Sequence, residues 1–595
     1  MNEISNIYHL LVRGAERTPK AIRFSEKKAG VWMGTDNATL LRQVQHLGRF
    51  LRERGLEPGE RCAILGQTCQ CWALCDLAVY AVAGVSVPIY PNLRLEDIAY
   101  IIDNSRARIL CLQSQEHLVE VEAARRAGGM PSLRAVLTFN TIGTLIGETH
   151  ENSNPFPGEV SKREDLATIV YTSGTTGPPK GAMLTHGNLL AEQEGLIEWF
   201  DQIERGDEPL SLLTYLPLAH MIARSEVYAG LFHDLRVHFA SALEALATEL
   251  LEIEPSILVA VPRVFEKVYE KIHDQIRCKS RLQRAIFSWA KHLGLRTEEK
   301  KETGERLRLN EQVQLALADR LVYRTIRSRF GSRFRFAILG GAPFPPVVHR
   351  FFAACGLTLL EGYGLTEVSA LSHGTRFGEV RVGTVGKPLR SITCRFDSDG
   401  EILLCGPTVF LGYYANPEAT ASAFDGAWFR TGDVGRLDCY GNLVITDRKK
   451  DLIITSQGKN IAPQNVEQVM SRSPLIEQFL CFGDRHKYLT GMIVPNVLRL
   501  SERLGCNLGT LPDWHLDTRV QKVIQTEVER LNQQLNRFEQ IKAFLVVPEP
   551  FTVENSLMTP TMKIRRRAVY QKYQKLLEAL YTAEEIATSS TSIIP

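Results

Sequence analysis

The sequence predicts an α/β protein followed by a smaller α+β region. Short apolar runs alternate with amphipathic stretches over residues 1–160, and the alternation returns over residues 165–400. Strands that alternate with helices pair in parallel, so each stretch is expected to form a largely parallel sheet with both faces covered. Past residue 450 the pattern changes to short strands and separate helices, which predicts a second, small domain.

Apolar runs mark the expected elements, and the turns that follow them are the expected places for chemistry. The strands of the two large regions are expected at 62–66, 85–89, 109–112, 167–170, 257–261, 336–339 and 357–360. Ligands of open α/β sheets lie beyond the carboxyl ends of such strands. In the small domain we expect helices over 463–470 and 519–535, strands over 479–482 and 492–494, and a frayed tail over 582–595.

Composition excludes several classes of protein. The 595 residues carry 70 Lys/Arg against 67 Asp/Glu, a net charge of +3, which argues against a nucleic-acid-binding protein. The first ten residues contain Glu3 and no apolar run, so no secretory signal is expected. The most apolar stretch, 71–91, is interrupted by Asp76, Gly84 and Pro88, so no transmembrane helix is predicted. We expect a cytoplasmic protein.

The cysteine pattern predicts ordinary thiols. Twelve cysteines are usual for a chain of this length in a reducing compartment. Cys69, Cys71 and Cys75 lie close together, but no second pair of ligands follows at the spacing of a zinc site. We therefore interpret them as core or helix-surface thiols.

One segment stands apart in charge. Residues 263–335 hold 19 Lys/Arg and 9 Asp/Glu, a balance of +10, and Leu282, Ile286, Trp289 and Leu293 recur in it at helical spacing. A basic amphipathic helix is typical of elements that lie on a membrane surface, and also of solvated insertions. The sequence favours a solvated helical insertion and keeps peripheral contact with the inner face of a membrane as the alternative.

A loop rich in glycine and hydroxyl residues is the strongest local feature. It follows an expected strand, and its hydroxyls, glycine backbone and lysine suit a polyphosphate. The residues are Thr172, Ser173, Gly174, Thr175, Thr176, Gly177 and Lys180. A Walker A loop has four residues between its first glycine and Gly-Lys-Ser/Thr, whereas here two residues separate Gly174 from Gly177 and two more separate Gly177 from Lys180. In addition, Gly181 stands where a serine or threonine is needed after the lysine. The P-loop NTPase interpretation therefore fails.

This loop and six further blocks resemble the adenylate-forming superfamily, which includes acyl-CoA synthetases, luciferases and nonribosomal adenylation domains. The blocks occur in the family's order at 216–220, 361–367, 383–388, 429–433, 447–448 and 559–563. The resemblance covers nearly the whole chain. It implies an N-terminal domain over 1–449, made of two stacked αβαβα-type subdomains and a distorted β-barrel. A small mobile C-terminal domain over 450–595 completes the expected fold.

The resemblance implies how the nucleotide is held. The loop from Ser173 to Lys180 is similar to the segment that wraps the β- and γ-phosphates of ATP, and Thr366 and Glu367 match residues that hold phosphate and Mg²⁺. A carboxylate is a suitable ligand for Mg²⁺. The residues implied for adenine and ribose are Gly340, Gly341, Ala342, Pro343, Glu361, Gly362, Tyr363, Gly364, Asp433 and Arg448. Among them, Tyr363 is expected to stack on adenine.

The same resemblance assigns roles in the C-terminal domain. Lys563 matches the lysine that neutralises charge on the α-phosphate and the acyl carboxylate during adenylation. Lys450, the second residue after Arg448, matches the hinge about which the small domain rotates between two half-reactions. Gly458 then leaves room for the pantetheine arm of coenzyme A. We expect Lys563, Thr366, Glu367 and His220 to be the catalytic group.

Three features resemble the long-chain fatty acyl-CoA synthetase branch: the block at 216–220, the basic insertion and the block at 559–563. His220 lies where that branch closes the acyl pocket, and Ala223-Arg224 stands where relatives have Glu-Arg. The expected activity is ATP-dependent formation of a long-chain acyl-AMP and then of acyl-CoA, in a monomer or a homodimer. The alternatives are an acyl-AMP ligase that loads a carrier protein, an enzyme for medium-chain or aryl acids, and a non-catalytic lipid- or nucleotide-binding relative.

Overall fold

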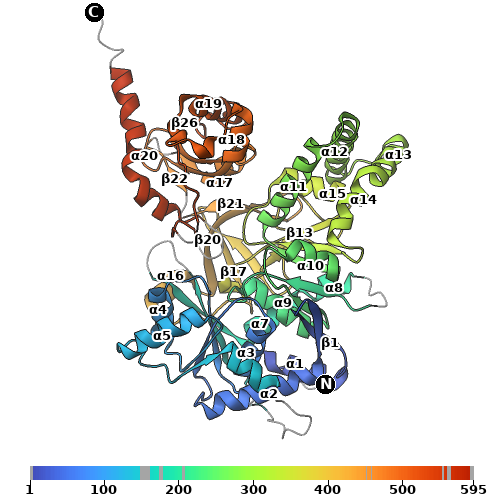
Figure 1. The fold of residues 1–595 in the computed structure, drawn as a ribbon, viewed down its shortest axis with the longest axis vertical. Coiled ribbons are helices and arrows are strands. Elements are labelled where there is room, and N and C mark those ends of the chain that lie inside the picture. The colour runs from blue at the N-terminus through green and yellow to red at the C-terminus, as the bar shows by residue number, and fades with distance from the viewer. Residues whose placement is uncertain are drawn as a thin grey trace, which may run out of the picture.

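A computed structural model describes residues 4–147, 158, 161–172, 178–203, 208–449, 452–456, 459–552, 555–558 and 564–589. We call the described residues up to 449 the body and those from 452 onward the lid. The lid lies above one end of the body, and a helical arm over 262–327 projects beside it (Figure 1). The architecture is the predicted α/β body with a smaller C-terminal unit.

The first sheet of the body has seven strands in the order β18-β8-β7-β4-β3-β5-β6. Its parallel centre contains three of the expected strands, at β3 (Arg61–Leu65), β4 (Val85–Ile89) and β5 (Ile109–Leu112). The remaining strands are β6 (Ala135–Thr138), β7 (Leu166–Thr172), which is the fourth expected strand of this sheet, β8 (Lys180–Thr185) and β18 (Gly412–Tyr413). Strands β7 and β8 pair antiparallel, and the predicted phosphate loop is the sequence that connects them.

The second sheet has nine strands in the order β15-β14-β13-β12-β11-β9-β10-β1-β2. It contains the remaining expected strands as β11 (Ile257–Ala260), β12 (Phe336–Leu339) and β13 (Thr358–Tyr363), which pair in parallel. The others are β1 (Ile22–Lys28), β2 (Val31–Asp36), β9 (Ser211–Thr214), β10 (Arg236–Phe239), β14 (His373–Gly374) and β15 (Lys387–Pro388). The carboxyl ends of β12 and β13 lead into the predicted nucleotide motifs.

A third, antiparallel sheet follows where the resemblance predicts a barrel. It consists of β16 (Thr393–Phe396), β17 (Glu401–Cys405), β19 (Phe424–Asp425), β20 (Trp428–Leu437) and β21 (Leu443–Arg448). The long strand β20 pairs with β17 on one side and with β21 on the other. This pairing sets Asp433 directly opposite Arg448.

Helices cover both large sheets, and the main core lies between them. They are α1 (Ile7–Arg17), α2 (Asn37–Glu53), α3 (Gln70–Ala81), α4 (Leu95–Ser105), α5 (Gln115–Arg126), α6 (Phe139–Gly147), α7 (His186–Gly195), α8 (Ile197–Asp201), α9 (Met221–Phe232), α10 (Leu246–Ile253), α15 (Pro346–Ala354) and α16 (Pro417–Ala423). Apolar residues of α3 and α9 are buried on nearly all sides. A helix that is apolar all round belongs in a core, so these two helices form the layer between the sheets.

An ion pair joins these two helices inside the core. Arg224 on α9 donates to Asp76 on α3 at 2.9 Å, and to the Thr168 hydroxyl of β7 at 2.9 Å. Tyr80 and Tyr228 complete the network. A buried guanidinium is stable only with such partners. Because these partners lie on α3 and on β7, Arg224 ties α9 to the first sheet and its covering helix. The arginine of the Ala223-Arg224 pair is therefore a structural residue in this chain.

The expected insertion is the helical arm. It contains α11 (Pro262–Arg277), α12 (Arg281–Glu302), α13 (Leu309–Ala318), the π-helix η1 (Asp319–Tyr323) and α14 (Arg324–Arg327). Ser280 and Gln283 form a capping box that starts α12. The inner face of the arm packs on α15, where Phe265 and Phe287 meet Phe351 and Phe352. The prediction of helix for this segment is confirmed.

The lid matches the expected elements closely. Its helix α17 spans Pro463–Met470, the range predicted, and α19 spans Thr518–Asn532. The remaining elements are β22 (Ile453–Ile454), β23 (Asn460–Ile461), β24 (Ile476–Phe482), β25 (Leu489–Pro495), α18 (Val497–Leu504), β26 (Ile541–Val546) and α20 (Arg566–Ser589). Helix α20 continues to Ser589, eight residues into the segment expected to be a frayed tail. Residues 590–595 lie outside the described part of the chain.

Two predicted absences concern membranes and metals. Among the described residues, no helix combines the length and the apolar character needed to cross a bilayer. Cys75 is buried in the core, while Cys69 and Cys71 are half-buried. In the same described ranges, the group with closely spaced ligand atoms is acidic (Asp397, Asp399 and Glu401) and contains no cysteine.

Candidate active site

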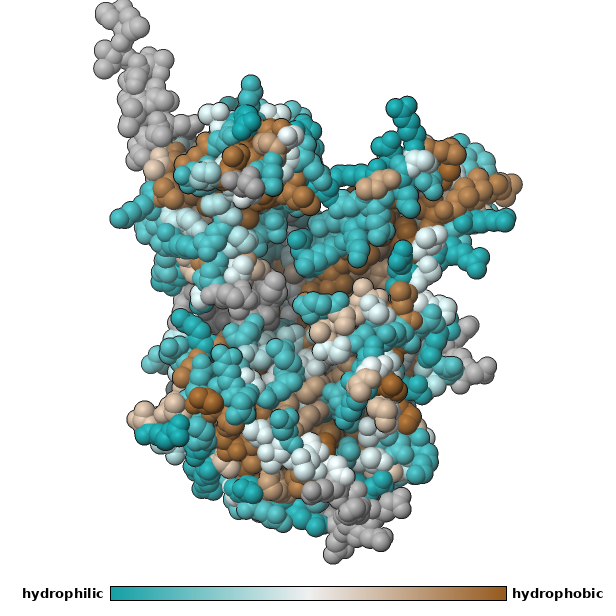
Figure 2. Space-filling view, viewed as in Figure 1, coloured by the Kyte–Doolittle hydropathy of each residue, from teal (hydrophilic) through white to brown (hydrophobic). Residues whose placement is uncertain are grey.

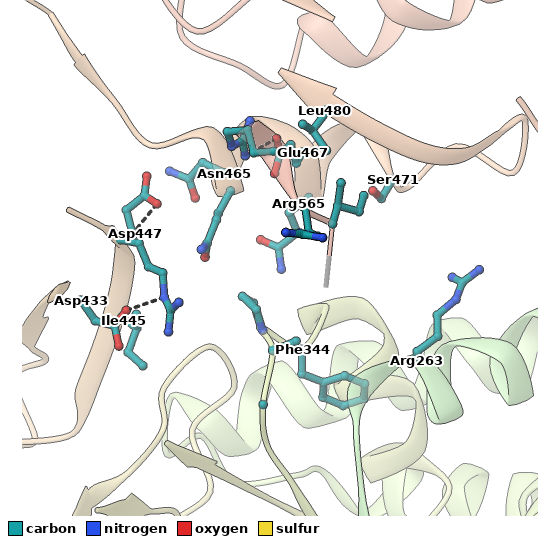
Figure 3. A pocket seen from close by; sticks show the side chains of 18 of the residues that line it. Arg263, Phe344, Asp433, Ile445, Asp447, Asn465, Glu467, Ser471, Leu480 and Arg565 are labelled. Carbon is teal, nitrogen blue, oxygen red and sulfur yellow. Dashed lines mark hydrogen bonds and ion pairs between the residues drawn. The ribbon is translucent and has the colours of Figure 1, made fainter. Parts of the chain in front are cut away.

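The candidate site is a large cleft between the body and the lid. It has a volume of about 3260 Å³ and is lined by the carboxyl ends of β12 and β13, the turns of the third sheet, α11 of the arm and the inner face of the lid. Figure 3 shows Asp433 and Phe344 on the body and Glu467 and Arg565 on the lid facing the same space. The described residues that were predicted to bind the nucleotide line this cleft, except Gly340, which lies behind its neighbour Gly341 in the same turn.

The phosphate loop begins and ends at this cleft. Thr172 and Lys180 are paired across the β7–β8 hairpin, and both line the cleft. Ser173, Gly174, Thr175, Thr176 and Gly177 lie outside the described residues. The Nζ of Lys180 lies 5.2 Å from the ring centroid of Tyr413, a cation–π contact that holds the ammonium at the wall of the cleft.

Glu367 lies beside this lysine in a short helical turn (η3, Thr366–Val368). The Tyr413 hydroxyl donates to its Oε1 at 2.9 Å. Burial raises the pKa of the Glu367 carboxyl, because water no longer solvates its charge. A cation beside the carboxylate reverses that cost, so a buried carboxylate with a second oxygen to offer fits a hard ion such as Mg²⁺. Half-buried Thr366 precedes it in the cleft wall.

Gly364 makes this turn feasible. A Cβ atom at Gly364 would lie 1.8 Å from the carbonyl oxygen of Ala370, so any other residue would clash with the backbone. Ser369 and Ala370 close the turn with positive φ angles of 65° and 109°. Such strained backbone is retained where the surroundings fix it, commonly at functional sites. The glycine of the motif is therefore required for placing Thr366 and Glu367.

Tyr363, Asp433 and Arg448 form a hydrogen-bonded group on the wall of the cleft. The Tyr363 hydroxyl donates to Asp433 Oδ2 at 2.7 Å, and Arg448 Nε donates to Asp433 Oδ1 at 2.9 Å. Asp433 is 3% exposed, so the two donors hold its carboxylate in one orientation. Each carboxylate oxygen has a second acceptor position. The group can therefore accept a pair of hydroxyls, as the ribose prediction requires.

The glycine turn after β12 also borders the cleft. Gly341 has a φ of +84° and lines the cleft together with Ala342 and Pro343. Gly340 donates its N–H to the carbonyl of Ala260 at 3.2 Å, and a Cβ there would press on the Gly362 carbonyl at 3.4 Å. The turn is thereby held against the end of β13.

Glu361 on β13 is buried and paired, which the sequence did not indicate. Its Oε1 lies 2.7 Å from Nδ1 of His349 on α15. The Glu361 backbone is also tied to Thr375, whose hydroxyl donates to the Glu361 carbonyl at 2.8 Å. These bonds fix the end of β13 from which Gly362 and Tyr363 extend.

His220 caps the first turn of α9 at the edge of the cleft. Its Nδ1 accepts the N–H of Ile222 at 3.1 Å. A backbone N–H can only donate, so the neutral ring carries its proton on Nε2. The cap also fixes the ring at the predicted end of the acyl pocket.

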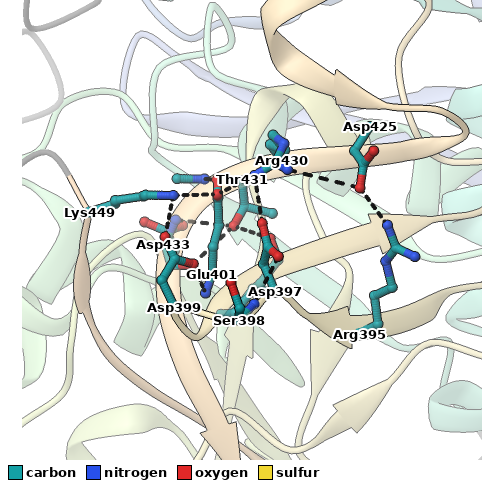
Figure 4. Close-up of polar contacts among 12 residues, drawn as sticks. Arg395, Asp397, Ser398, Asp399, Glu401, Asp425, Arg430, Thr431, Asp433 and Lys449 are labelled. Atoms are coloured by element: carbon teal, nitrogen blue, oxygen red, sulfur yellow. Dashed lines mark hydrogen bonds and ion pairs between the residues drawn. The ribbon is translucent and has the colours of Figure 1, made fainter.

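Lys449, the last described residue of the body, is anchored by acids. Its Nζ lies 2.5 Å from Asp399 Oδ2 and 3.0 Å from Glu401 Oε2, and its N–H bonds to the Gly432 carbonyl at 2.8 Å (Figure 4). Arg430 also binds Glu401, at 3.0 Å. The acidic group is therefore neutralised by two basic side chains. Lys450, the predicted hinge, follows this anchor and lies outside the described residues.

Two further predicted residues, Gly458 and Lys563, have described neighbours on both sides. Gly458 and Lys563 lie outside the described residues, but their flanks are placed. Ile453 and Ile454 pair with Asn460 and Ile461. Met558 pairs with Ile564 across the segment that contains Lys563, and Ile564 and Arg565 line the cleft.

Four contributing residues were missed from the sequence: Tyr413, His349, Glu401 and Lys449. Tyr413 binds Glu367 from a strand that pairs with the phosphate hairpin, 46 positions along the chain. His349 acts through Glu361, and the other two form the anchor before the hinge. For these residues the sequence offers one signal, which is that Lys449 and Lys450 are adjacent. Two neighbouring lysines need acidic side chains nearby to balance their charge.

These features together are those expected of an adenylate-forming enzyme: a two-part α/β fold with a cleft lined by the ends of the β7–β8 hairpin, the buried carboxylate of Glu367 and the fixed carboxylate of Asp433. The chain belongs to the AMP-binding enzyme family, which it matches over residues 13–414, with the C-terminal domain of that family over 450–585.

Known relatives and structures agree with this assignment. The chain is 34% identical to the long-chain-fatty-acid–CoA ligase FadD15 of Mycobacterium bovis, with 98% of each chain covered. It is 30% identical to the rat long-chain-fatty-acid–CoA ligase 5, covering 91% of this chain and 83% of that protein. The fold matches the o-succinylbenzoate CoA synthetase of Bacillus subtilis with a TM-score of 0.71 at 20% identity, over 96% and 98% of the chains.

Proposed function

We propose that the protein is an ATP-dependent ligase that converts a long-chain fatty acid to its acyl-AMP and then to the acyl-CoA. The observation that carries the proposal is one cleft that contains the Tyr363–Asp433–Arg448 group together with Lys180 and Glu367. Similarity to long-chain ligases along 98% of the chain supports the choice of substrate. We propose a cytoplasmic location for it.

In the adenylation step, an oxygen of the fatty acid carboxylate attacks the α-phosphorus of ATP and pyrophosphate leaves. Lys180 neutralises charge on the departing phosphates, and Asp433 holds the ribose hydroxyls so that the α-phosphate faces the acid. Mg²⁺ on Glu367, when bound, would neutralise further phosphate charge. Thr366, beside Glu367, donates its hydroxyl to a phosphate oxygen.

Lys563 supplies the remaining charge in this step. Met558 and Ile564, which flank it in the sequence, pair with each other, and Ile564 and Arg565 line the cleft. A lysine ammonium placed there meets the negative charge that builds up on the attacking carboxylate and the α-phosphate. Its task ends once acyl-AMP has formed.

The second step needs a different orientation of the lid. The thiol of coenzyme A attacks the acyl carbonyl, loses its proton, and AMP leaves with the electron pair of the broken C–O bond. We propose that the lid turns about Lys450, which replaces the Lys563 loop at the cleft by the segment around Gly458. Asp433 keeps the nucleotide in place throughout, so the body serves both steps.

A panel of carboxylic acids of graded length tests the proposal. Pyrophosphate exchange reports adenylation, and acyl-CoA formation is measured in parallel with and without coenzyme A. We expect exchange with long-chain acids and a thioester product only when coenzyme A is present. Exchange without acyl-CoA would assign the enzyme to carrier-protein loading, and exchange limited to short or aryl acids would overturn the choice of substrate.

A further inference from the structure

The outer face of the arm carries a row of exposed apolar side chains. Leu309, Val313, Leu317 and Leu321 follow one another at every fourth position along α13 and η1, and we call them the ridge. Their exposed fractions are 81%, 70%, 50% and 49%. Figure 2 shows apolar side chains gathered at the outer end of the arm. Single exposed leucines are common on proteins, but a contiguous row marks an interaction surface.

The backbone limits how far this row drifts around the helix axis. Residues four apart in an α-helix drift about 40° around the axis, because each residue advances about 100°. The π-helix η1 over Asp319–Tyr323 is wider and advances fewer degrees per residue, so it returns Leu321 towards the line of the first three. The opposite face of the same helices is already used, since Ala318, Tyr323 and Ile326 are buried in the arm's core. The ridge is therefore a second apolar face.

Basic side chains border the ridge at both ends. Arg306 and Arg308 are exposed at its start, and Arg320 and Arg324 at its end. No ion pair of these four arginines occurs within the residues that the structure describes. The acids in the same stretch are engaged elsewhere: Glu311 binds Lys300 at 2.7 Å, and Asp319 binds Arg327 at 2.5 Å. The outward face is therefore apolar along its middle and positive at its ends.

We propose that the ridge docks on a lipid bilayer that contains anionic lipid. Leucine side chains enter the boundary between headgroups and acyl chains, while the bordering arginines bind lipid phosphates. A second copy of the chain is a poorer occupant, because a symmetric contact between two ridges would bring the arginines of both copies together. The sequence left open whether the basic segment is a solvated insertion or a membrane-surface element. The ridge favours the membrane-surface element, and the count of charges alone does not reveal it.

Docking here also places the cleft usefully. The arm's first helix, α11, lines the cleft with Arg263, Lys267, Tyr269 and His273. If the proposed fatty acid substrate is correct, the arm holds the cleft near the surface in which that acid dissolves. The docking itself does not depend on which acid is the substrate.

Vesicle sedimentation of the full-length protein tests the docking. Vesicles of phosphatidylcholine alone are compared with vesicles that also contain phosphatidylglycerol, at low and high salt. The ridge variant carries Leu309→Gln, Val313→Gln, Leu317→Gln and Leu321→Gln. The matched control carries Val31→Gln and Met33→Gln, two exposed apolar residues on β2 far along the chain, which are 61% and 53% exposed.

We expect the wild type and the control to bind anionic vesicles and to be released by salt. The ridge variant should bind at least about tenfold more weakly, since four side chains no longer bury apolar surface. A double Arg320→Gln and Arg324→Gln variant should retain weak binding with a smaller salt dependence. Turnover of a water-soluble acid without vesicles, and the thermal melting temperature, should be unchanged in all variants, which separates docking from catalysis and folding.

Two results would overturn the proposal. One is wild-type protein that sediments no better with anionic vesicles than without them, or a ridge variant that binds as the wild type does. The other is a ridge variant that turns a dimer into a monomer while vesicle binding stays the same, which would assign the ridge to a second copy of the chain. Analytical ultracentrifugation of the same samples measures the oligomeric state.

Discussion

On the body side of the cleft, Asp433 and Tyr363 are buried and bonded to each other, whereas on the lid side Ser471, Arg472 and Arg565 are exposed. The body residues are held in one geometry before any ligand arrives. The exposed lid residues can leave the cleft at little cost, because few bonds are broken when they move. The difference teaches that the body can serve both half-reactions unchanged, while the lid supplies what differs between them.

The body side should be the more sensitive of the two. Replacing Asp433 by Ala removes the acceptor for the ribose hydroxyls and leaves Tyr363 and Arg448 without their shared partner. We expect both adenylation and thioesterification of supplied acyl-AMP to fall by about 10³ or more. Asp425→Ala removes a half-exposed carboxylate of the same sheet and should change neither rate. A loss confined to one half-reaction would refute a constant role for the body.

A lid residue should divide the two steps. Lys563→Ala is expected to slow adenylation by about 10²-fold, because charge in that transition state is no longer neutralised. Conversion of supplied acyl-AMP with coenzyme A should be retained. Lys575→Ala, an exposed basic residue on α20, is the control and should affect neither step. Equal losses in both steps would mean that the lysine acts as a binding residue for the shared nucleotide.

The parts that the sequence predicts are those set by local patterns. The helix beginning at Pro463 and the strand at Val85–Ile89 appear with the expected bounds, because capping and apolar runs determine them. The proximity of Asp433 and Arg448 was implied by motifs and is realised by cross-strand pairing. Contacts between distant segments were not predictable, since Tyr413 reaches Glu367 only when an edge strand joins the phosphate hairpin. The ridge likewise becomes visible only when the other face of α13 is seen to be buried.

The interior of the body should become less stable as the pH rises. Burial raises the pKa of Glu192 to about 8, from 4.5 in the unfolded chain, although Ser225 donates to it at 2.8 Å. The folded protein therefore keeps a proton on Glu192 that the unfolded chain releases above about pH 4.5. The stabilisation that comes from this proton is complete below about pH 4.5 and is lost as the pH rises towards 8. Between these two pH values the free energy of unfolding should fall by about 1.4 kcal/mol per pH unit.

Thermal melting across this pH range checks the sign and the origin of the effect. Glu192→Gln keeps the size and hydrogen-bonding capacity of the side chain but cannot ionise, so its melting temperature should depend less on pH than that of the wild type. Glu194→Gln, on the solvent side of the same helix and paired with Arg163, should leave the wild-type slope unchanged. If both variants keep that slope, the pH dependence arises elsewhere in the chain.

The smallest effect is expected at the joint between the two regions. Lys449 is bound by Asp399 and Glu401, so it fixes the body end of the linker and confines rotation to the residues after it. Lys449→Ala should therefore leave the affinity for ATP unchanged and slow the complete reaction by a few-fold, because the lid samples more orientations between steps. Lys387→Ala removes a comparable lysine–glutamate pair elsewhere on the body, with Glu379, and should have no effect, as expected of an exposed ion pair. Single-turnover rates of each half-reaction are measured for the wild type and for both variants. A variant that loses ATP affinity as well would place Lys449 in the binding site and remove the distinction between a fixed body and a movable lid.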